Sequence, residues 1–404
     1  MDMDNEFWKW VEEHGSDDPK KLWLKYGKTH EAQIVQVECR RRFGKKLEAT
    51  LRRVPHWLFP SKLAGEQSTG DRLAAFHARL VPEACRMADL TAGLGIDALH
   101  CAGVAAEVTA LEIDPAKADA LRANMAEAGV GNVRVVCADC REWLEAYDGP
   151  RLDMVFIDPA RRAGDGGRVF ALADCEPDVT AMLPLLRRKA HCVLLKMSPM
   201  LDIASVMASL PECVRVWALG TPTECKELVA LVDFEHGGDS GRGDVVTEAV
   251  TIGVDATHEF RCTRSEEMTA DAVYGRPRLG DWLCEPYPAV MKIGAVRLVA
   301  ERFGLQKLAA NTHAYFAPAR REGFPGEQRR IVAVLPYASK VLKRFKREYP
   351  RCEVAVRNFG ISAEALRAKL GTADGAGVRV LGVTDIGAEK LLVVTESADK
   401  SANV

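Results

Sequence analysis

The sequence lacks the features that place a protein in a membrane or outside the cell. No run approaches the roughly 18 apolar residues of a membrane-spanning helix, and the first segment, MDMDNEFWKW, has neither the basic start nor the apolar stretch of a signal peptide. Its twelve cysteines are scattered through 404 residues, which is typical of reduced core thiols and not of a disulfide framework. We therefore expect a cytoplasmic protein without a membrane association.

The sequence also lacks a charge excess of either sign, since 55 basic residues are balanced by 57 acidic ones. This balance excludes a generally basic nucleic-acid coat, so any contact with a nucleic acid needs a local patch. The chain has a single C-x-x-C pair, Cys137 to Cys140, and no second pair to complete a zinc site. We expect no metal.

The chain is long enough for two or three domains, each with its own core. From Phe7 to about Arg53 apolar residues recur at helical spacing, and prolines at 55 and 60 interrupt that pattern. Short apolar runs then alternate with helical stretches, which indicates parallel strands joined by helices. We expect strands at 86–90, 107–111, 133–137, 154–157, 192–196 and 214–219, with the segment EAVTIGV completing the sheet.

These patterns predict an N-terminal helical region at 1–66 and an α/β domain at 67–255. Beyond residue 255 the sequence becomes rich in turn-forming residues, and patterns typical of helices and short strands then alternate again. The last third of the chain is therefore expected to form one or two small α+β modules.

A glycine-rich loop, DLTAGLGID, follows the first expected strand and leads into a helix. Glycines at this place permit a tight turn and a close approach of the backbone to a ligand. A purely structural turn explains the glycines equally well, and Gly93, Gly95 and Ala98 also satisfy the dinucleotide fingerprint G-x-G-x-x-A. The loop alone therefore leaves the cofactor open.

Acidic residues at successive strand ends discriminate between cofactors. Glu112 ends the second strand, where its carboxylate can accept hydrogen bonds from both ribose hydroxyls. Asp89 suits the cationic methionine end of S-adenosylmethionine better than a pyrophosphate. Asp139 and Asp158 follow the third and fourth strands, and Asp139 is placed to hold an adenine amino group. Together with the loop, these acids resemble motifs I to IV of class I methyltransferases.

We therefore expect S-adenosylmethionine as the cofactor and a Rossmann-like sheet as the fold. A nicotinamide-dependent oxidoreductase is the alternative from another enzyme class. The residues expected at the cofactor are Asp89, Thr91, Gly93, Gly95, Asp97, Glu112, Asp114 and Asp139.

Seven segments resemble a particular family, the THUMP-like-domain class I methyltransferases: QSTGDRLAAFHA, DLTAGLGID, IDPARR, LKMSPMLD, ECKEL, EPYPAVMKIGAV and VRNFG. The resemblance covers nearly the whole chain. It implies a ferredoxin-like module at 256–325, a THUMP-like module at 326–404, and an enzyme that acts on RNA such as tRNA or rRNA, because THUMP domains are associated with RNA modification.

Methyl transfer from a sulfonium is an in-line displacement, so the protein mainly aligns the nucleophile and excludes water. In amino-methylating relatives an acid and a proline after the fourth strand hold an exocyclic amine, and an aromatic ring stacks on the base. Here Asp158 and Pro159 match, whereas Ala160 and Arg161 depart from the pattern. The guanidinium of Arg161 can stack on a base or grip a phosphate, although the arginine pair also suits a solvated loop. The match implies methylation at a base nitrogen.

A second chemistry is the methylation of a ribose 2′-hydroxyl. Lys196 ends the fifth strand and Glu224 or Glu227 follows the sixth; with Asp158 and Lys62 these residues resemble the Lys-Asp-Lys-Glu set of 2′-O-methyltransferases. In that scheme a lysine lowers the pKa of the hydroxyl and the acids tune the lysine. The non-catalytic alternative is a structural ion pair between Lys196 and Glu224. Methylation at pyrimidine C5 needs a cysteine nucleophile, which IDPARR and KMSPM do not supply.

Residues 317–351 carry ten basic and three acidic side chains. Such a local excess suits the tracking of RNA phosphates, although a solvated helix face would have the same composition. A catalytically silent RNA-binding protein therefore stays open as an alternative, and the sequence says nothing about oligomeric state. The residues expected at the substrate are Gln67, Thr69, Arg162, Lys340 and Arg344.

Overall fold

The computed structural model describes residues 5–161, 171–235 and 244–397. Within these residues, no helix has both the length and the apolar character that crossing a membrane requires. The chain forms two compact units, of which the first comprises Met1–Val216 and Glu227–Gly243 and the second Trp217–Lys226 and Asp244–Val404.

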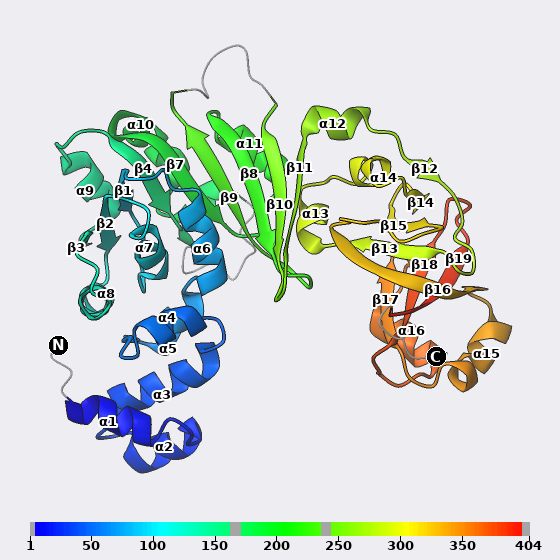
Figure 1. The fold of residues 1–404 in the computed structure, drawn as a ribbon, viewed down its shortest axis with the longest axis horizontal. Helices are drawn as coiled ribbons and strands as arrows, with labels where there is room; N and C mark the ends of the chain where they lie inside the picture. The colour runs from blue at the N-terminus through cyan, green and yellow to red at the C-terminus, as the bar shows by residue number, and fades with distance from the viewer. Residues whose placement is uncertain (1–4, 162–170, 236–243, 398–404) are drawn as a thin grey trace. The chain divides into compact units, whose positions relative to one another are not determined.

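The first unit begins with a cluster of helices that precedes the α/β part (Figure 1). Buried polar contacts attach this cluster to the α/β part. The Asn124 side chain accepts a hydrogen bond from the Leu58 amide at 2.6 Å and donates one to the Leu58 carbonyl at 3.0 Å. Such a reciprocal pair fixes both distance and orientation, so the segment that leads to the site is anchored. The helices are α1 (Asn5–Glu13), α2 (Pro19–Tyr26), α3 (Glu31–Phe43), α4 (Glu48–Arg53), α5 (Lys62–Gln67) and α6 (Asp71–Arg79).

The predicted strands and the α/β fold class are confirmed, with strand ends within two residues of those expected. Among the described residues, nine strands form one sheet whose order begins at β3 and ends at β11. In that order the strands are β3 (Val133–Cys137), β2 (Glu107–Glu112), β1 (Arg86–Asp89), β4 (Leu152–Ile157), β7 (Ala190–Met197), β9 (Cys225–Asp233), β8 (Cys213–Gly220), β10 (Val246–Ile252) and β11 (Thr257–Thr263).

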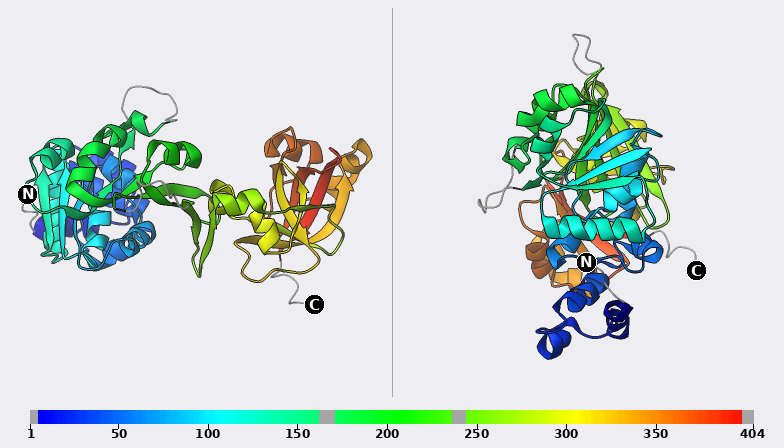
Figure 2. Two further views of the ribbon diagram at one scale, coloured as in Figure 1. Left: turned by 90° about the horizontal axis from the view of Figure 1, so that it is seen from above. Right: turned by 90° about the vertical axis from the view of Figure 1, so that its left-hand side faces the viewer.

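The order of the strands creates a place for a ligand. Strand β1 pairs in parallel with β2 on one side and with β4 on the other, so the chain leaves β1 in one direction and later returns on its opposite side. Open α/β sheets bind ligands at such a switch point, beside the carboxyl ends of the strands. Helices lie on either side of these strands (Figure 2), namely α7 (Ile96–Cys101), α8 (Pro115–Glu127), α9 (Cys140–Ala146), α10 (Val179–Lys189) and α11 (Ile203–Ser209).

Two strands depart from the sequence-based expectation. The segment that contains ECKEL forms β9, which pairs antiparallel with β7. Strand β11 pairs antiparallel with β10 over seven residues, so the sheet continues to Thr263. A domain boundary at residue 255 would therefore divide this hairpin.

Beyond Thr263, the described part of the second unit contains an eight-stranded sheet. Strand β13 pairs with β16, so the two expected C-terminal modules share one continuous hydrogen-bonded ladder. The strands, in sheet order, are β12 (Val273–Tyr274), β14 (Gln306–Ala309), β15 (Thr312–Ala317), β13 (Trp282–Pro286), β16 (Gly326–Pro336), β19 (Lys390–Glu396), β18 (Val378–Thr384) and β17 (Glu353–Arg357). The helices are α12 (Arg264–Thr269), α13 (Pro288–Lys292), α14 (Leu298–Arg302), α15 (Ser339–Glu348) and α16 (Ala363–Leu370).

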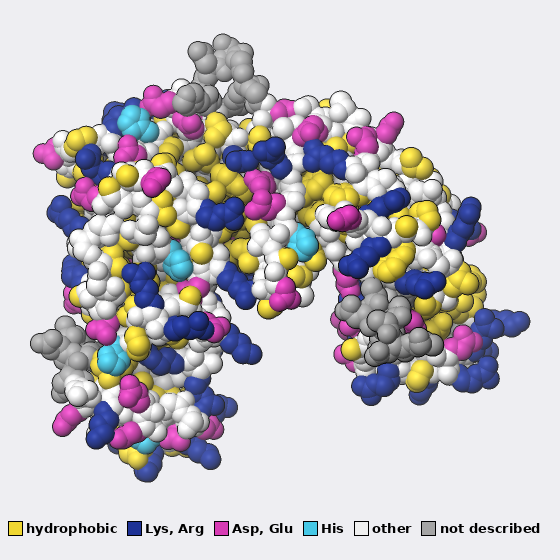
Figure 3. Space-filling model, viewed as in Figure 1, with side chains coloured by type: hydrophobic (Ala, Val, Ile, Leu, Met, Phe, Trp, Pro, Cys, Tyr) yellow, Lys and Arg dark blue, Asp and Glu magenta, His cyan; other side chains and the backbone are white. Residues whose placement is uncertain are grey.

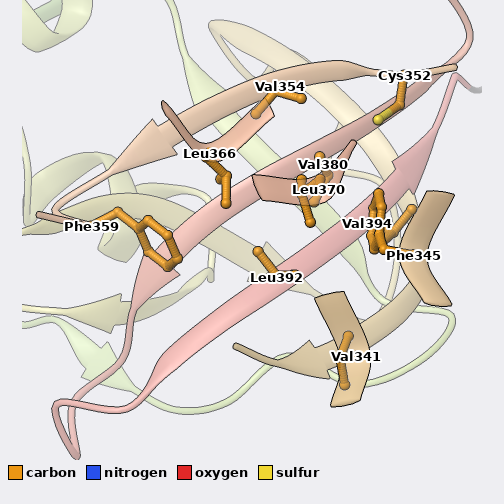
Figure 4. Packing of buried hydrophobic residues seen from close by; sticks show 10 residues of the cluster. All are labelled: Val341, Phe345, Cys352, Val354, Phe359, Leu366, Leu370, Val380, Leu392 and Val394. Atoms are coloured by element: carbon orange, nitrogen blue, oxygen red, sulfur yellow. The ribbon is translucent and has the colours of Figure 1, made fainter. Parts of the chain in front are cut away.

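Helices α15 and α16 pack their apolar faces on this sheet. Val341 and Phe345 of α15 and Leu366 and Leu370 of α16 contact the side chains of β18 and β19 (Figure 4). Burying a side chain of this size stabilises the fold by about 1.5–3 kcal/mol. The burial leaves the polar face of α15 to solvent.

Candidate active site

The glycine loop turns tightly against α8 while one side of its backbone stays open. Gly93 and Gly95 adopt φ values of +54° and +87°, in the left-handed region that favours glycine. A Cβ at Gly95 would lie 2.1 Å from Cδ1 of Leu121, whereas a Cβ at Gly93 would meet only the Thr91 carbonyl, at 3.9 Å. The loop therefore presents accessible backbone at Gly93.

The first two strand-end acids are buried at the edge where this loop begins. Asp89 is 1% exposed and accepts a hydrogen bond from the Thr91 amide at 3.1 Å. Burial raises the pKa of Asp89 well above its ordinary value, and the carboxylate of Asp97 raises it further. Glu112, also buried, accepts a hydrogen bond from the Asp114 amide at 2.9 Å. Both carboxylates are thus held in place before any ligand binds.

The next two acids serve as helix caps. One oxygen of Asp114 accepts from the amides of Ala116 and Lys117 at the start of α8. Asp139 does the same at the start of α9, with the amides of Arg141 and Glu142 at 2.8 and 3.0 Å. Contact of Asp114 and Asp139 with a cofactor therefore stays a prediction.

One residue at this edge was not among the site residues predicted from the sequence. Ile113 lies between Glu112 and Asp114, and its side chain is 65% exposed. A large aliphatic side chain exposed beside a ligand-binding edge can pack against a flat aromatic ligand. The available signal was its position, a single apolar residue between two acids that directly follow a strand.

The segment after β4 is tied to the glycine loop. The Asp158 amide donates a hydrogen bond to Oγ1 of Thr91 at 2.7 Å, so Thr91 supports the Asp158 backbone. The next residues form a short strand, β5 (Ala160–Arg161), which pairs with β6 (Cys175–Glu176). Arg162 lies outside the described residues.

Lys196, at the end of β7, contacts three groups of the site. Its Nζ lies 2.5 Å from Oδ2 of Asp158, 3.1 Å from Oγ1 of Thr69 and 3.9 Å from Oε2 of Glu227. Burial lowers the pKa of Lys196, but the surrounding carboxylates outweigh that effect and raise it. The side chain is therefore an ammonium, and Thr69, which is buried, holds it in place.

Two of the five candidate residues for the expected Lys-Asp-Lys-Glu set lie elsewhere. Glu224 is exposed and pairs with Lys226 at 2.5 Å, so the predicted contact between Glu224 and Lys196 is wrong. Lys62 pairs with Glu38 of the helical cluster, also at 2.5 Å. The other three candidates, Asp158, Lys196 and Glu227, come together. Gln67 is exposed at the end of α5.

His77 was not recognised from the sequence, although it has no exposed surface and contacts two acids of the site. Its Nδ1 lies 2.7 Å from Oδ1 of Asp97, and its Nε2 lies 2.6 Å from Oε1 of Glu227. Burial lowers the pKa of His77, but the two carboxylates outweigh this and raise it to about 10. Asp97, whose burial is offset by His77, has its pKa lowered to about 2. A lone histidine in an amphipathic helix offers no local sequence signal.

In the second unit, the basic residues of α15 form an exposed face. Lys340 and Arg344 lie on it, and Arg344 is 3.5 Å from Glu348. Lysine and arginine side chains gather over this helix on the face shown in Figure 3. The aromatic residues nearby, Phe345 and Tyr349, pack into or against the core, so they are not a stacking surface. The other exposed basic residues of the helix are Lys343, Lys346 and Arg347.

Comparisons with known proteins agree with these features. Two family models match the second unit: a ferredoxin-like domain over residues 282–325 and a THUMP domain-like family over 326–397. The chain is 27% identical over 352 residues to an uncharacterised S-adenosylmethionine-dependent methyltransferase of Mycobacterium tuberculosis, and the match covers 85% of this chain and 88% of that one.

Two further relatives differ in how much of the chain they match. A segment of 93 residues is 37% identical to an uncharacterised RNA methyltransferase of Thermosynechococcus vestitus, but it spans only 23% of this chain and 20% of that relative. A crystal structure from Porphyromonas gingivalis W83, described as that of a methyltransferase, superposes with a TM-score of 0.86, 28% identity and 97% coverage of both chains.

Proposed function

Because the chain is a class I S-adenosylmethionine-dependent methyltransferase with a C-terminal THUMP-like domain, we propose that it methylates an RNA nucleotide at a base nitrogen. The observation that carries this proposal is the hydrogen bond between the Asp158 amide and Thr91. It joins the segment expected to hold the acceptor to the loop expected to hold the donor.

The donor side fits S-adenosylmethionine. Gly93 leaves the backbone open to a ligand, and Glu112 offers a fixed carboxylate for the ribose hydroxyls. Asp89, buried at the end of β1, is proposed to meet the amino end of the methionine moiety. When bound, the cofactor supplies an electrophilic methyl group on a sulfonium. The nicotinamide alternative has no comparable support, since the relative matched over 352 residues is named for S-adenosylmethionine.

On the acceptor side, the chain's own residues orient the nucleophile. Lys196 binds Oδ2 of Asp158, so an acceptor amine would donate its hydrogen bond to Oδ1. That bond would fix the direction of the nitrogen lone pair, which an in-line displacement requires. Pro159 has no amide hydrogen and contributes only its carbonyl to the same task.

RNA as the substrate is supported by two independent features. The relative from T. vestitus is named as an RNA methyltransferase, and a THUMP domain-like model matches residues 326–397. The exposed basic face of α15 lies within that range and can follow a phosphate backbone. We propose Lys340 and Arg344 as phosphate contacts.

Mass spectrometry of nucleosides tests this function. Total tRNA and rRNA are compared between cells with the gene, cells without it, and cells that express Asp158→Ala. We expect one methylated base to be absent from the second and third samples. Identical nucleoside profiles in the first two samples would contradict an RNA substrate.

A second candidate, ribose 2′-O-methylation, is favoured by one contact, the 2.5 Å pair of Lys196 and Asp158 with Glu227 nearby. An ammonium beside a hydroxyl lowers the pKa of that hydroxyl. The two products are distinguished chemically, because a 2′-O-methyl group blocks alkaline cleavage of the adjacent phosphodiester and a base methyl group does not. Loss of an alkali-resistant dinucleotide in the mutant would favour this candidate.

A further inference from the structure

Five buried side chains of the first unit form a closed ring of polar contacts. Asp97 contacts His77, which contacts Glu227; Glu227 lies beside Lys196, which donates to Thr69, and Thr69 donates to Asp97 at 2.5 Å. All five are at most 9% exposed. Buried polar groups are costly unless each has a partner, so a ring in which every member contacts two others is a defined structural unit.

The chemistry of the ring assigns the charge of His77. Both of its nitrogens lie within 2.7 Å of carboxylate oxygens, and an ionised carboxylate can only accept a hydrogen bond. Between two ionised carboxylates both nitrogens carry a proton, so the His77 side chain is an imidazolium. By the same reasoning Thr69 donates its hydroxyl proton to Asp97, so its oxygen accepts from Lys196.

The ring connects the two halves of the site. Asp97 lies in the first turn of α7, directly after the glycine loop, and Lys196 binds Asp158 on the acceptor side. Asp97, Glu227 and Asp158 contribute three negative charges, while His77 and Lys196 contribute two positive ones. The ring and Asp158 together thus carry one net negative charge, which is of the sign that favours a sulfonium cation nearby.

We infer that His77 is a permanent cation and that His77, Glu227 and Thr69 are positioning residues, which hold Lys196 against Asp158 and fasten this pair, through Asp97, to the first turn of the helix that follows the glycine loop. The inference rests on the proposed function for its effect on catalysis, but not for the charge state of His77. Displacement of a positioned group by about 1 Å can slow a reaction by about 100-fold.

The charge state is tested by nitrogen-15 NMR of the wild-type protein at pH 7. An imidazolium has two nitrogens with nearly equal chemical shifts, whereas a neutral ring has two widely separated ones. The chain has nine histidines, so the His77 signals are assigned by their loss in His77→Asn. We expect two protonated nitrogens that are protected from exchange. A neutral His77 would overturn the inference whatever the enzyme does.

The positioning role is tested by two matched pairs of variants. Thr69→Val removes the hydroxyl without changing the shape of the side chain, and Thr69→Ser keeps it. Glu227→Gln removes one charge of the ring, and Glu235→Gln makes the same change at an exposed glutamate just beyond β9. For Thr69→Val and Glu227→Gln we expect kcat for RNA methylation to fall about 10- to 100-fold, with the Kd for S-adenosylhomocysteine unchanged within about threefold.

We expect Thr69→Ser and Glu235→Gln to keep kcat within about threefold of wild type. Equal kcat values for Thr69→Val and Thr69→Ser would overturn the positioning role, and so would a loss of cofactor affinity as large as the loss of kcat. If a variant fails to fold, the other pair and the NMR signals of the wild type decide the question. If the wild type methylates no RNA, the proposed function fails, and the charged ring is decided by NMR alone.

Discussion

The ammonium of Lys196 and the carboxylate of Asp158 approach to 2.5 Å across two adjacent parallel strands, β7 and β4. Replacing Lys196 leaves the partly exposed Asp158 without its ammonium partner, and replacing Asp158 leaves the buried Lys196 with Glu227 at 3.9 Å. Breaking such a pair from one side costs about 3–5 kcal/mol when both partners are buried, and less where solvent reaches one of them, as it does Asp158. This pair therefore has consequences for both stability and catalysis.

Asp158→Ala is expected to reduce methyl transfer about 100-fold or more while leaving the Kd for S-adenosylhomocysteine within about threefold of wild type, because it removes the group that orients the acceptor and not the cofactor cradle. Incorporation of radiolabelled methyl groups into RNA measures the first effect, and calorimetry measures the second. Asp148→Ala, the same change in an exposed loop, serves as the control. Equal transfer rates in the two variants would remove Asp158 from the mechanism.

Gly95→Ala is expected to destabilise the protein by several kcal/mol and to abolish cofactor binding. The added Cβ faces both an unfavourable φ, which costs about 1–2 kcal/mol, and a clash with Leu121, which costs about 1–3 kcal/mol more. Gly129→Ala is the matched control, because Gly129 has a φ of +65° but nothing within 4 Å of the new Cβ. Urea denaturation should separate the two; similar losses would mean that the contact with Leu121 has no effect.

Asp89→Asn is expected to stabilise the protein in the absence of cofactor, increasingly as the pH rises. The folded-state pKa of Asp89 is raised, so the folded protein binds a proton that the unfolded chain releases above its ordinary pKa of 3.8. Wild-type stability therefore falls with pH from about 3.8 up to the folded-state pKa, and the asparagine variant lacks this loss. Thermal unfolding at pH 4.5 and pH 7.5 tests the difference between the two proteins. If the difference in stability between Asp89→Asn and wild type shrinks as the pH rises, the raised pKa of Asp89 is contradicted. We also expect Asp89→Asn to bind S-adenosylhomocysteine more weakly than wild type.

Replacing Lys340 and Arg344 with glutamate should weaken RNA binding and flatten its dependence on salt. Each lost phosphate contact lowers the slope of log K against log salt concentration by about 0.7 for single strands and about 0.9 for duplexes. The control changes two exposed lysines of α2, Lys20 and Lys21, in the same way. If both double variants change the slope equally, RNA contact is a matter of overall charge and not of α15.

The sequence by itself determined the strands around the site, the glycine loop and the acids at the strand ends. These features depend on local physical chemistry: alternation of apolar runs with helical periodicity, φ values that only glycine adopts readily, and the shared edge at which parallel strands end. The class of fold and the cofactor followed from them, because Asp89 and Glu112 needed no partner distant in the sequence to be recognised.

Only the tertiary structure decided which side chains meet. His77 and Glu227 are 150 residues apart, and the choice of Glu227 over Glu224 depends on β9 lying antiparallel beside β7, which no local pattern shows. Lys62 has the residue type and the approximate place of a catalytic lysine, yet packing directs it to Glu38. Contacts between buried charges depend on strand register and helix packing to within about 1 Å, since each side chain is held only where its partners lie. That precision belongs to the folded chain and not to its local segments.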